Sequence, residues 1–385
     1  MLFRSKDIEQ IIRRFLWSGG VEKTYGSKVA WHRVCLPKKE GGLGIKPLVE
    51  MNSVHNLKHI WNLLSPTNCS HWKKWIQTSM LKGNSFWIVK PPAQYSWYWR
   101  KLLKLRDIAK PLVKYKIGNG IDTSLWHDPW LPFGSIFEKY GSSVMYYTAI
   151  PLSSKVQAII AWNEWAWPIT SSWERIEIKA ATALLPSPSH NKDVVSWIPS
   201  LSGTFITSHT WDFLRASSPK VPWYHLVWFF GNIPRFSFIV WLAILNKLYT
   251  QDRIWKFTPR PLACVLCHKA LESHDHLFFT CDYSSFIWQE IMSRFTMDGS
   301  PLDWSSIILW AASKWKSKKP KDIMPRMCFG ATIYAIWRER NARVFRQEGK
   351  PRERTSRDIL IYIHTQIQVT WARDPKVQDY LDLCN

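Results

Sequence analysis

The chain has 385 residues, 46% of them hydrophobic, so it is long enough for two or three domains with real cores and too apolar to be disordered. Its 52 lysines and arginines face 29 acids, and the net charge of +23 favours a polyanionic partner, with nucleic acid preferred over an anionic membrane surface. The sequence has neither a secretory signal nor an apolar run long enough to span a bilayer, which predicts an intracellular protein, cytoplasmic or nuclear and not secreted.

The predicted elements begin with two amphipathic helices. Apolar residues at helical spacing follow Ser5 and predict a helix that ends near the Ser18–Gly20 turn. A second helix is predicted from about Met51 to Leu64. The intervening residues 21–50 are predicted to be extended, with a glycine-rich turn.

Residues 71–120 are basic and aromatic. Eleven lysines and arginines occur here against one acid, Asp107, with tryptophans and tyrosines between them. Nucleic-acid contact and a solvated basic face over an aromatic core are equally weighted interpretations of this pattern. In the first interpretation the basic residues contact phosphates and Trp97 or Trp99 stacks on bases. The candidate phosphate contacts are Lys73, Lys74, Arg100, Lys101, Lys104 and Arg106.

The following segments predict short elements and then helices. The Gly-Asn-Gly turn in residues 115–132 predicts a β-hairpin, whose Asp122 and Asp128 are interpreted as turn residues, and residues 133–200 predict loops with short elements. A buried helix is predicted from Pro234 to about Leu248.

The C-terminal part continues with a basic linker at 313–322 and a last helical region from about Arg326. A group of arginines in that region is predicted to lie on a surface helix. They are Arg338, Arg340, Arg343 and Arg346.

The stretch "CVLCHKALESHDHLFFTC" (264–281) has the spacing of a metal site. Cys264 and Cys267 form C-x2-C, and His276 and Cys281 follow at finger-like distances. Three thiolates and one imidazole form a complete tetrahedral set for structural zinc, with no position open for a substrate. His274 is the alternative to His276, and a redox C-x-x-C is the alternative to zinc.

Signatures of catalysis are not recognised in the sequence. There is no P-loop, no H-E-x-x-H, no G-x-S-x-G and no Asp-Asp pair. The glycine pairs at 41–47 and 118–123 match only part of a dinucleotide loop and are interpreted as turns. Nucleotidyl transfer by two metal ions needs clustered carboxylates, so we expect no enzyme activity and no small-molecule substrate.

Several motifs in order resemble the C-terminal part of plant non-LTR (LINE-type) retrotransposon reverse transcriptases, including the reverse-transcriptase zinc-binding domain. The motifs are "FLWSG", "KVAWHRVCLPKKEGGLGIKPL", "IGNGIDTSLWHDPWL", "VPWYHLVWF", "FIVWLAILNKLYTQDRI", "CVLC" and "ESHDHLFFTC". The resemblance implies zinc ligands at Cys264, Cys267, His276 and Cys281. The polymerase signature of the family, Tyr-x-Asp-Asp, has no match, which implies a truncated reading frame.

The sequence therefore predicts an α+β, predominantly helical protein with a small zinc module packed among helices and short strands in the tryptophan-rich middle. Four segments are expected: a thumb-like remnant at 1–70, the basic middle region at 71–200, the zinc-binding domain at 201–295 and a basic helical tail at 296–385. The predicted function is a zinc-binding, RNA- or DNA-associating module without catalysis. The alternative is a protein–protein scaffold or a non-functional retroelement fragment.

Overall fold

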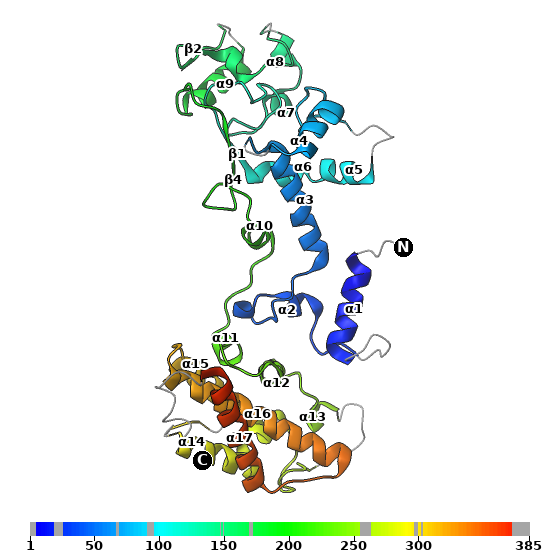
Figure 1. The fold of residues 1–385 in the computed structure, drawn as a ribbon, viewed down its shortest axis with the longest axis vertical. Coiled ribbons are helices and arrows are strands. Elements are labelled where there is room, and N and C mark those ends of the chain that lie inside the picture. The colour runs from blue at the N-terminus through cyan, green and yellow to red at the C-terminus, as the bar shows by residue number, and fades with distance from the viewer. Residues whose placement is uncertain are drawn as a thin grey trace. The chain divides into compact units, whose positions relative to one another are not determined.

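The protein folds into two compact units in a computed structural model (Figure 1). Unit 1 comprises residues 1–10 and 46–217, and unit 2 comprises residues 11–45 and 218–385. The structure describes residues 5–18, 26–66, 69–90, 96–146, 148, 150–168, 172–254, 263–295, 299–301 and 303–371.

Unit 1 is built from short helices and two small sheets. The first helix, α1 (Ser5–Ser18), contributes its first residues to unit 1 and the remainder to unit 2. The other helical elements of unit 1 are α3 (Leu48–Leu64), α4 (His71–Trp75), η2 (Ile76–Leu81), α5 (Trp97–Lys104), α6 (Arg106–Ala109), η3 (Lys110–Leu112), α7 (Ile136–Tyr140), α8 (Ser143–Tyr146), η4 (Val156–Ile159), α9 (Trp173–Ala183) and α10 (Thr207–Leu214). Its strands are β1 (Val113–Lys116), β2 (Ile160–Ala161), β3 (Glu164–Trp165) and β4 (Val194–Trp197).

The strands of unit 1 pair differently from the sequence prediction. β1 is antiparallel to β4, with Tyr115 opposite Val195, so its partner lies about eighty residues downstream. The local hairpin predicted within residues 115–132 is wrong. The Gly-Asn-Gly segment instead wraps the Asp193 carboxylate, which accepts hydrogen bonds from the backbone N–H groups of Gly118 and Gly120 at 2.8 and 2.9 Å. These bonds explain why the segment turns without continuing into a paired strand.

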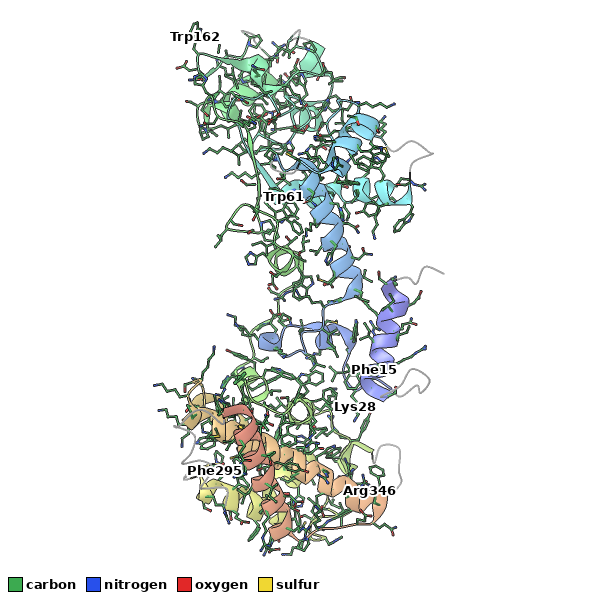
Figure 2. The ribbon with its side chains drawn as sticks, in the orientation of Figure 1. Phe15, Lys28, Trp61, Trp162, Phe295 and Arg346 are labelled. Carbon is green, nitrogen blue, oxygen red and sulfur yellow. The ribbon has the colours of Figure 1, made fainter. Side chains whose placement is uncertain are left out.

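Tryptophans form much of the unit 1 core. Trp61 meets Trp197 edge-to-face at 5.8 Å, and Trp197 also donates its Nε1–H to Thr210 Oγ1 at 2.8 Å. Trp162, on the β2–β3 turn, is 98% exposed in contrast (Figure 2). Most of the tryptophans of unit 1 therefore contribute packing area, and some of them, such as Trp197, also bond through the indole N–H inside the fold.

Unit 2 is predominantly helical in its described residues. Its elements are the remainder of α1, α2 (Trp31–Cys35), η1 (Lys38–Glu40), α11 (Tyr224–Val227), α12 (Pro234–Ile244), α13 (Gln251–Ile254), η6 (His276–Thr280), α14 (Asp282–Arg294), α15 (Trp304–Lys314), α16 (Pro320–Arg346) and α17 (Arg352–Trp371). The predicted helices at 5–18, 51–64 and from Pro234 are confirmed. Residues 31–35 are helical, so the expectation that 21–50 is extended is wrong there.

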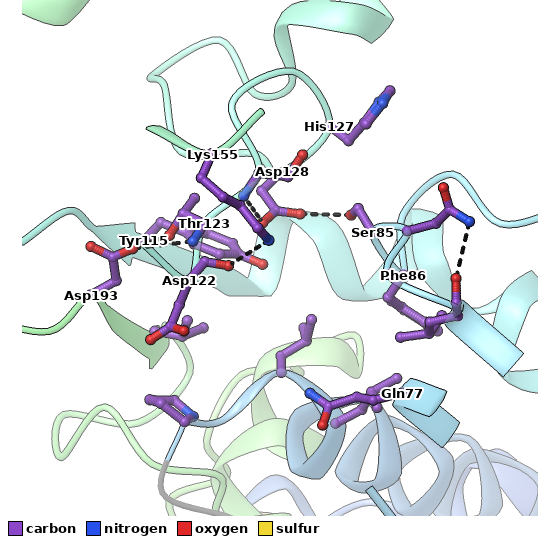
Figure 3. Close-up of a pocket in the computed structure, with 18 of the residues that line it drawn as sticks. Gln77, Ser85, Phe86, Tyr115, Asp122, Thr123, His127, Asp128, Lys155 and Asp193 are labelled. Atoms are coloured by element: carbon purple, nitrogen blue, oxygen red, sulfur yellow. Dashed lines mark hydrogen bonds between the residues drawn. The ribbon is translucent and has the colours of Figure 1, made fainter. Parts of the chain in front are cut away.

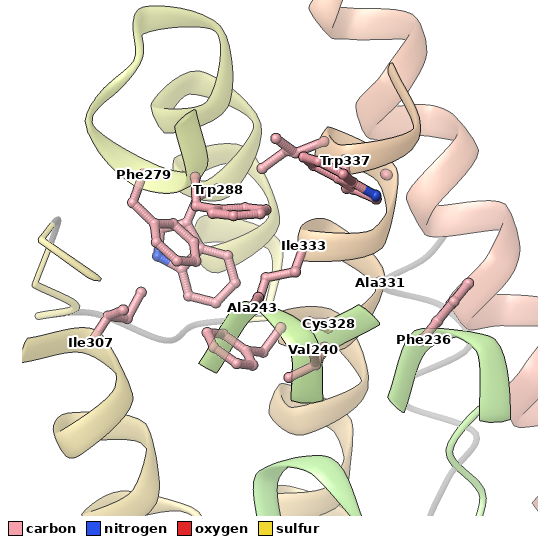
Figure 4. Packing of buried hydrophobic residues seen from close by; sticks show 14 of the residues in the cluster. Phe236, Val240, Ala243, Phe279, Trp288, Ile307, Cys328, Ala331, Ile333 and Trp337 are labelled. Atoms are coloured by element: carbon pink, nitrogen blue, oxygen red, sulfur yellow. The ribbon is translucent and has the colours of Figure 1, made fainter. Parts of the chain in front are cut away.

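The core of unit 2 is one continuous hydrophobic cluster around α12, α14 and α16 (Figure 4). Phe279, from the turn that carries His276, stacks on Phe329 of α16 at 6.0 Å and meets Trp288 of α14 edge-to-face at 5.4 Å. Val240 of α12 is fully buried in the same cluster. The cysteine–histidine segment is thus packed among helices, and the predicted predominantly helical fold class is confirmed.

Among the described residues, no helix combines the length and apolarity needed to cross a membrane.

Candidate metal centre and basic surface

The first two cysteines of the cluster lie on one tight turn. The N–H of Cys264 donates to the carbonyl of Ala270 at 2.7 Å, and the N–H of His268 donates to the carbonyl of Cys264 at 2.8 Å. His268 has a φ of +57°, a left-handed conformation that reverses the chain directly after Cys267. The C-x2-C spacing therefore places both thiols on the same side of a closed loop.

The second pair lies on a π turn. The N–H of Cys281 donates to the carbonyl of His276 at 2.8 Å, five residues earlier, and Ser273 Oγ accepts from the N–H of His276 at 3.1 Å. Cys281 is also the N-cap of α14. A helix N-terminus favours negative charge, so this position suits a thiolate.

The four side chains converge. One ligand atom from each of Cys264, Cys267, His276 and Cys281 lies within 4.8 Å of all the others. The Sγ atoms of Cys264 and Cys281 are 3.9 Å apart, and Cys267 Sγ is 3.2 Å from His276 Nε2. A tetrahedral zinc ion with ordinary bond lengths separates two sulfurs by about 3.8 Å and a sulfur from a nitrogen by about 3.5 Å. The observed set has the dimensions and the donor chemistry of a closed zinc site.

The sulfur pair at the buried side of the cluster is electrostatically coupled. The hydrogen bond between the sulfurs of Cys264 and Cys281 lowers the pKa of Cys264 and raises the pKa of Cys281, so one proton is shared by the pair. Backbone N–H groups of Leu266 and Cys267 also bond to Cys264 and lower its pKa. Thiolates are the form that binds metal, so this environment favours a cation.

The two spare histidines lie elsewhere. His274 is 3% exposed and packs edge-to-face on Trp304 at 4.5 Å and against Phe278 at 4.9 Å. Burial lowers its pKa to about 4, so it is a neutral packing residue. His268 is exposed on the far side of the left-handed turn. The geometry thus brings His276, rather than His274, to the three cysteines.

Two arginines of α16 hold the metal-site segment. Arg343 Nη1 donates to the carbonyls of Val265 and Leu266, the two residues between the first cysteines, at 3.1 and 3.2 Å. Arg340 makes a two-pronged ion pair with Glu272 that is almost wholly buried, with Nη2 to Oε1 at 2.8 Å. The predicted surface arginine group is therefore wrong for these two residues.

Arg340 and Arg343 lie on the side of α16 that faces the cysteine loop. There the planar guanidinium groups donate to the Glu272 carboxylate and to backbone carbonyls of the loop. Arg338 and Arg346 are exposed, as predicted.

The basic stretch predicted from the sequence divides between surface and core. On α5, four of its residues share one face at positions i, i+3, i+4 and i+7. Trp97 is 68% exposed, and Lys101 Nζ lies 5.1 Å from the centroid of its ring. Lys101 is half-buried, and Arg100 and Lys104 are exposed. This cationic–aromatic face is presented to solvent.

The remaining candidates have structural partners. Trp99 is 2% exposed and meets Phe86 edge-to-face at 6.0 Å, so its ring is not open to a base. Lys73 is buried and donates its Nζ–H to the carbonyl of Ser65. Arg106 donates to the carbonyl of Val89 at 2.7 Å, and burial lowers its pKa to about 10. Lys74 is exposed.

A cavity of about 820 Å³ lies in unit 1 beside α4 (Figure 3). Asp128 accepts from Ser85 Oγ and from the N–H of Ser124, each at 2.7 Å, and its pKa is raised by burial despite these bonds. Lys155 donates to the carbonyl of Asp122 at 3.3 Å. The ionisable lining includes four lysines and three aspartates, whose charges nearly balance: Lys73, Lys74, Lys155, Lys192, Asp122, Asp128 and Asp193. The hairpin in which Asp122 and Asp128 are interpreted as turn residues does not form; Asp128 instead bonds to Ser85 and to the backbone of Ser124.

Comparison with known proteins gives matches for both parts of the chain. Residues 205–288 match the family model described as zinc-binding in reverse transcriptase, and this segment contains all four cluster residues. A putative ribonuclease H protein of Arabidopsis thaliana is 24% identical over 367 residues, which cover 90% of this chain and 57% of the relative. An uncharacterized mitochondrial protein of the same plant is 24% identical over 127 residues, which cover 33% of this chain and 82% of that protein.

The chain thus spans little more than half the length of the first of these relatives. The matches confirm the resemblance, predicted from the sequence, to the C-terminal part of a plant LINE-type reverse transcriptase with its zinc-binding domain. The matched segment falls within the predicted zinc-binding domain at 201–295.

Proposed function

We propose that this chain is a zinc-binding, nucleic-acid-associating module derived from a retrotransposon reverse transcriptase, and that it carries out no catalysis. The observation that carries the proposal is the convergence of Cys264, Cys267, His276 and Cys281, with ligand atoms within 4.8 Å of one another, inside the matched segment. A zinc ion bound there would join the C-x2-C turn to the start of α14.

The chemistry of the ligand set indicates a structural metal. Three thiolates and one imidazole fill the four positions of tetrahedral zinc and leave none for water or substrate. Cys264 and Cys281 are fully buried, so their thiolates would be costly without a cation. Metal binding at such a site contributes directly to the folding free energy.

Zinc binding is tested on the purified full chain. Mass spectrometry of metal content should give one zinc per chain, and Cys281→Ser should lose it while Cys69→Ser, an exposed cysteine outside the cluster, should keep it. If the wild-type chain contains no metal even when it is purified in a buffer with zinc, this part of the proposal is contradicted.

The exposed face of α5 is the proposed contact for nucleic acid. Its three cations can bind phosphates, and Trp97 offers an exposed ring for stacking on a base. Lys74 supplies a further exposed cation outside α5. Lys73, Arg106 and Trp99 are omitted from this surface because each is packed or hydrogen-bonded inside the fold.

The salt dependence of binding to a 20-nucleotide single-stranded RNA or DNA tests this surface. The triple variant Arg100→Gln, Lys101→Gln, Lys104→Gln should lower the slope of log K against log salt by about two, since each phosphate contact contributes roughly 0.7 for a single strand. The matched control removes the same charge from the exposed residues Lys318, Lys319 and Lys321. Equal losses in both variants would contradict a localised surface, and an absence of binding at 50 mM salt would contradict nucleic-acid association.

Two other functions predict different outcomes. A protein–protein scaffold would bind zinc without salt-sensitive binding to nucleic acid. A ribonuclease H, as the name of one relative suggests for that protein, would cleave the RNA of an RNA–DNA hybrid in the presence of Mg²⁺. We expect no cleavage, because the sequence offers no recognised cluster of carboxylates to hold two metal ions.

A further inference from the structure

Arg343 contacts the metal-site turn at the two peptide groups next to a ligand. Its Nη1 donates to the carbonyl oxygens of Val265 and Leu266, at 3.1 and 3.2 Å. These carbonyls belong to the peptide units whose N–H groups are those of Leu266 and Cys267. Both of these N–H groups act on the sulfur of Cys264 and lower its pKa. One guanidinium and one thiolate therefore lie at opposite ends of the same two peptide units.

Peptide geometry makes this arrangement directional. In a trans peptide the C=O and N–H bonds point in opposite directions, and no cis peptide occurs among the described residues. A donor that fixes the two carbonyls on one side of the turn consequently aims the two N–H groups at the other side. There they meet Cys264, a buried sulfur of the cluster.

Arg343 is itself held by several groups. Its Nε donates to Glu339 Oε1 and its Nη2 to the carbonyl of Lys350, each at 2.9 Å. The guanidinium carbon lies 4.7 Å from the ring centroid of Tyr283, and the N–H of Lys350 donates to the same Glu339 carboxylate at 2.7 Å. These contacts fix the side chain without involving a cluster sulfur, which reduces the ordering cost of its two bonds to the turn.

A second anchor lies at the other end of the loop. Glu272 directly follows Leu271, which bridges to Ala263 across the base of the cysteine loop. Its carboxylate receives Arg340 and also accepts from the N–H of Gln251 at 2.9 Å. α16 therefore holds both the tip and the base of the loop, although α16 lies outside the segment 205–288 that matches the zinc-binding family model.

We propose that Arg343 is a positioning residue of the metal centre, which orients two peptide N–H groups onto Cys264, and that the metal-binding unit extends through α16. The inference rests on the proposed zinc binding and adds to it residues beyond the matched segment. A zinc ion with three thiolates and one imidazole carries a net charge of −1, so N–H groups aimed at a sulfur stabilise the loaded centre. The positive charge of Arg343 acts in the same direction.

The test compares three variants of the full chain: Arg343→Gln, Arg343→Lys and Arg346→Gln. Arg346 lies one turn further along α16, is exposed, and loses the same charge without touching the loop. Zinc affinity is measured by competition with a chromophoric chelator. We expect a dissociation constant 10- to 100-fold higher for Arg343→Gln, as for other groups that support metal ligands, an intermediate value for Arg343→Lys, and the wild-type value for Arg346→Gln.

Replacing zinc by cobalt distinguishes an effect of Arg343 on the thiolates from a general loss of stability. The sulfur-to-cobalt charge-transfer band reports electron density on the thiolates, so loss of N–H···S bonds should shift it in Arg343→Gln and less in Arg343→Lys. If Arg343→Gln does not fold, the inference is tested with Arg343→Lys, through the position of its cobalt charge-transfer band and its zinc affinity. Wild-type affinity and an unshifted band in the folded Arg343 variants overturn the inference. A wild-type chain that binds no zinc overturns the proposed function itself.

Discussion

The two units use the same types of residue in opposite ways. In unit 2, cysteines, histidine and arginines are turned inward: Arg340 is 1% exposed and paired with a fully buried carboxylate, and two cluster cysteines are fully buried. In unit 1, much of the basic stretch lies at the surface together with Trp97, while Trp87 and Trp99 of the same stretch lie in the core. Composition shows that a chain has cations and aromatics to use. The fold decides which of them hold structure and which are left for a partner.

The largest effect should come from the metal ligands of unit 2. Cys264→Ser removes a buried thiolate from the closed set, and binding of structural zinc is worth on the order of 10 kcal/mol in zinc-finger peptides. We expect the variant to lose zinc and unit 2 to lose its cooperative thermal transition. Calorimetry of the full chain measures this. Cys69→Ser, the same chemical change at an exposed site in unit 1, should leave the melting profile unchanged.

If Cys264→Ser lost its zinc but kept the wild-type thermal transition of unit 2, the claim that a metal stabilises unit 2 would be contradicted.

An intermediate effect is expected from the buried ion pair. Arg340→Met leaves the Glu272 carboxylate buried without its partner, which typically costs about 3–5 kcal/mol. Urea denaturation of the zinc-loaded chain should show this loss in the unit 2 transition. The double variant Arg340→Met, Glu272→Met should recover a large part of it, because an apolar pair of similar volume carries no unpaired charge.

The contrasting ion pair in unit 1 joins Lys110 to Glu138, which is half exposed. Lys110→Met should cost less than about 1 kcal/mol. Equal losses of unfolding free energy in Lys110→Met and Arg340→Met would contradict the claim that the buried pair holds the cysteine loop to α16.

A further effect, smaller than that of Arg340→Met, separates two neighbouring lysines of unit 1. Lys73→Met removes a donor from the carbonyl of Ser65 in a buried position and should cost about 1–3 kcal/mol of stability. Lys74→Met should leave stability unchanged because Lys74 is exposed, and should weaken binding to single-stranded nucleic acid as one lost phosphate contact does. The opposite pattern, in which Lys74→Met is destabilising and Lys73→Met is not, would contradict the assignment of Lys73 to the interior and Lys74 to the surface of α4.

The convergence of Cys264, Cys267, His276 and Cys281 could be predicted from the sequence because it depends on short spacings. C-x2-C, a histidine and a cysteine within eighteen residues can only meet if the chain turns back, and the left-handed His268 and the π turn at His276 are the means. The sequence favoured His276 and kept His274 as the alternative, because nothing local excludes His274. In the structure His274 packs instead against Trp304, from a helix further along the chain.

The buried partners of Arg340 and Arg343 were also not predicted from the sequence. Glu272 and Arg340 lie 68 residues apart, and no local pattern records their contact. A signal was nevertheless present in α16: Phe329, Ile333 and Ile336 follow a helical period that continues to Arg340 and Arg343. Charged residues in register with an apolar stripe indicate buried pairing. The same limit explains the wrong hairpin, because the partner of β1 is a strand far along the chain.

Hydrogen exchange with and without a zinc chelator, read by mass spectrometry on the full chain, shows whether a bound metal holds unit 2 together. We expect chelation to remove amide protection from the cysteine loop, α14 and α16, while the β1–β4 pairing of unit 1 keeps its protection. Protection that is unchanged in unit 2 after the metal is removed, or lost equally in both units, would contradict a metal that holds unit 2 alone.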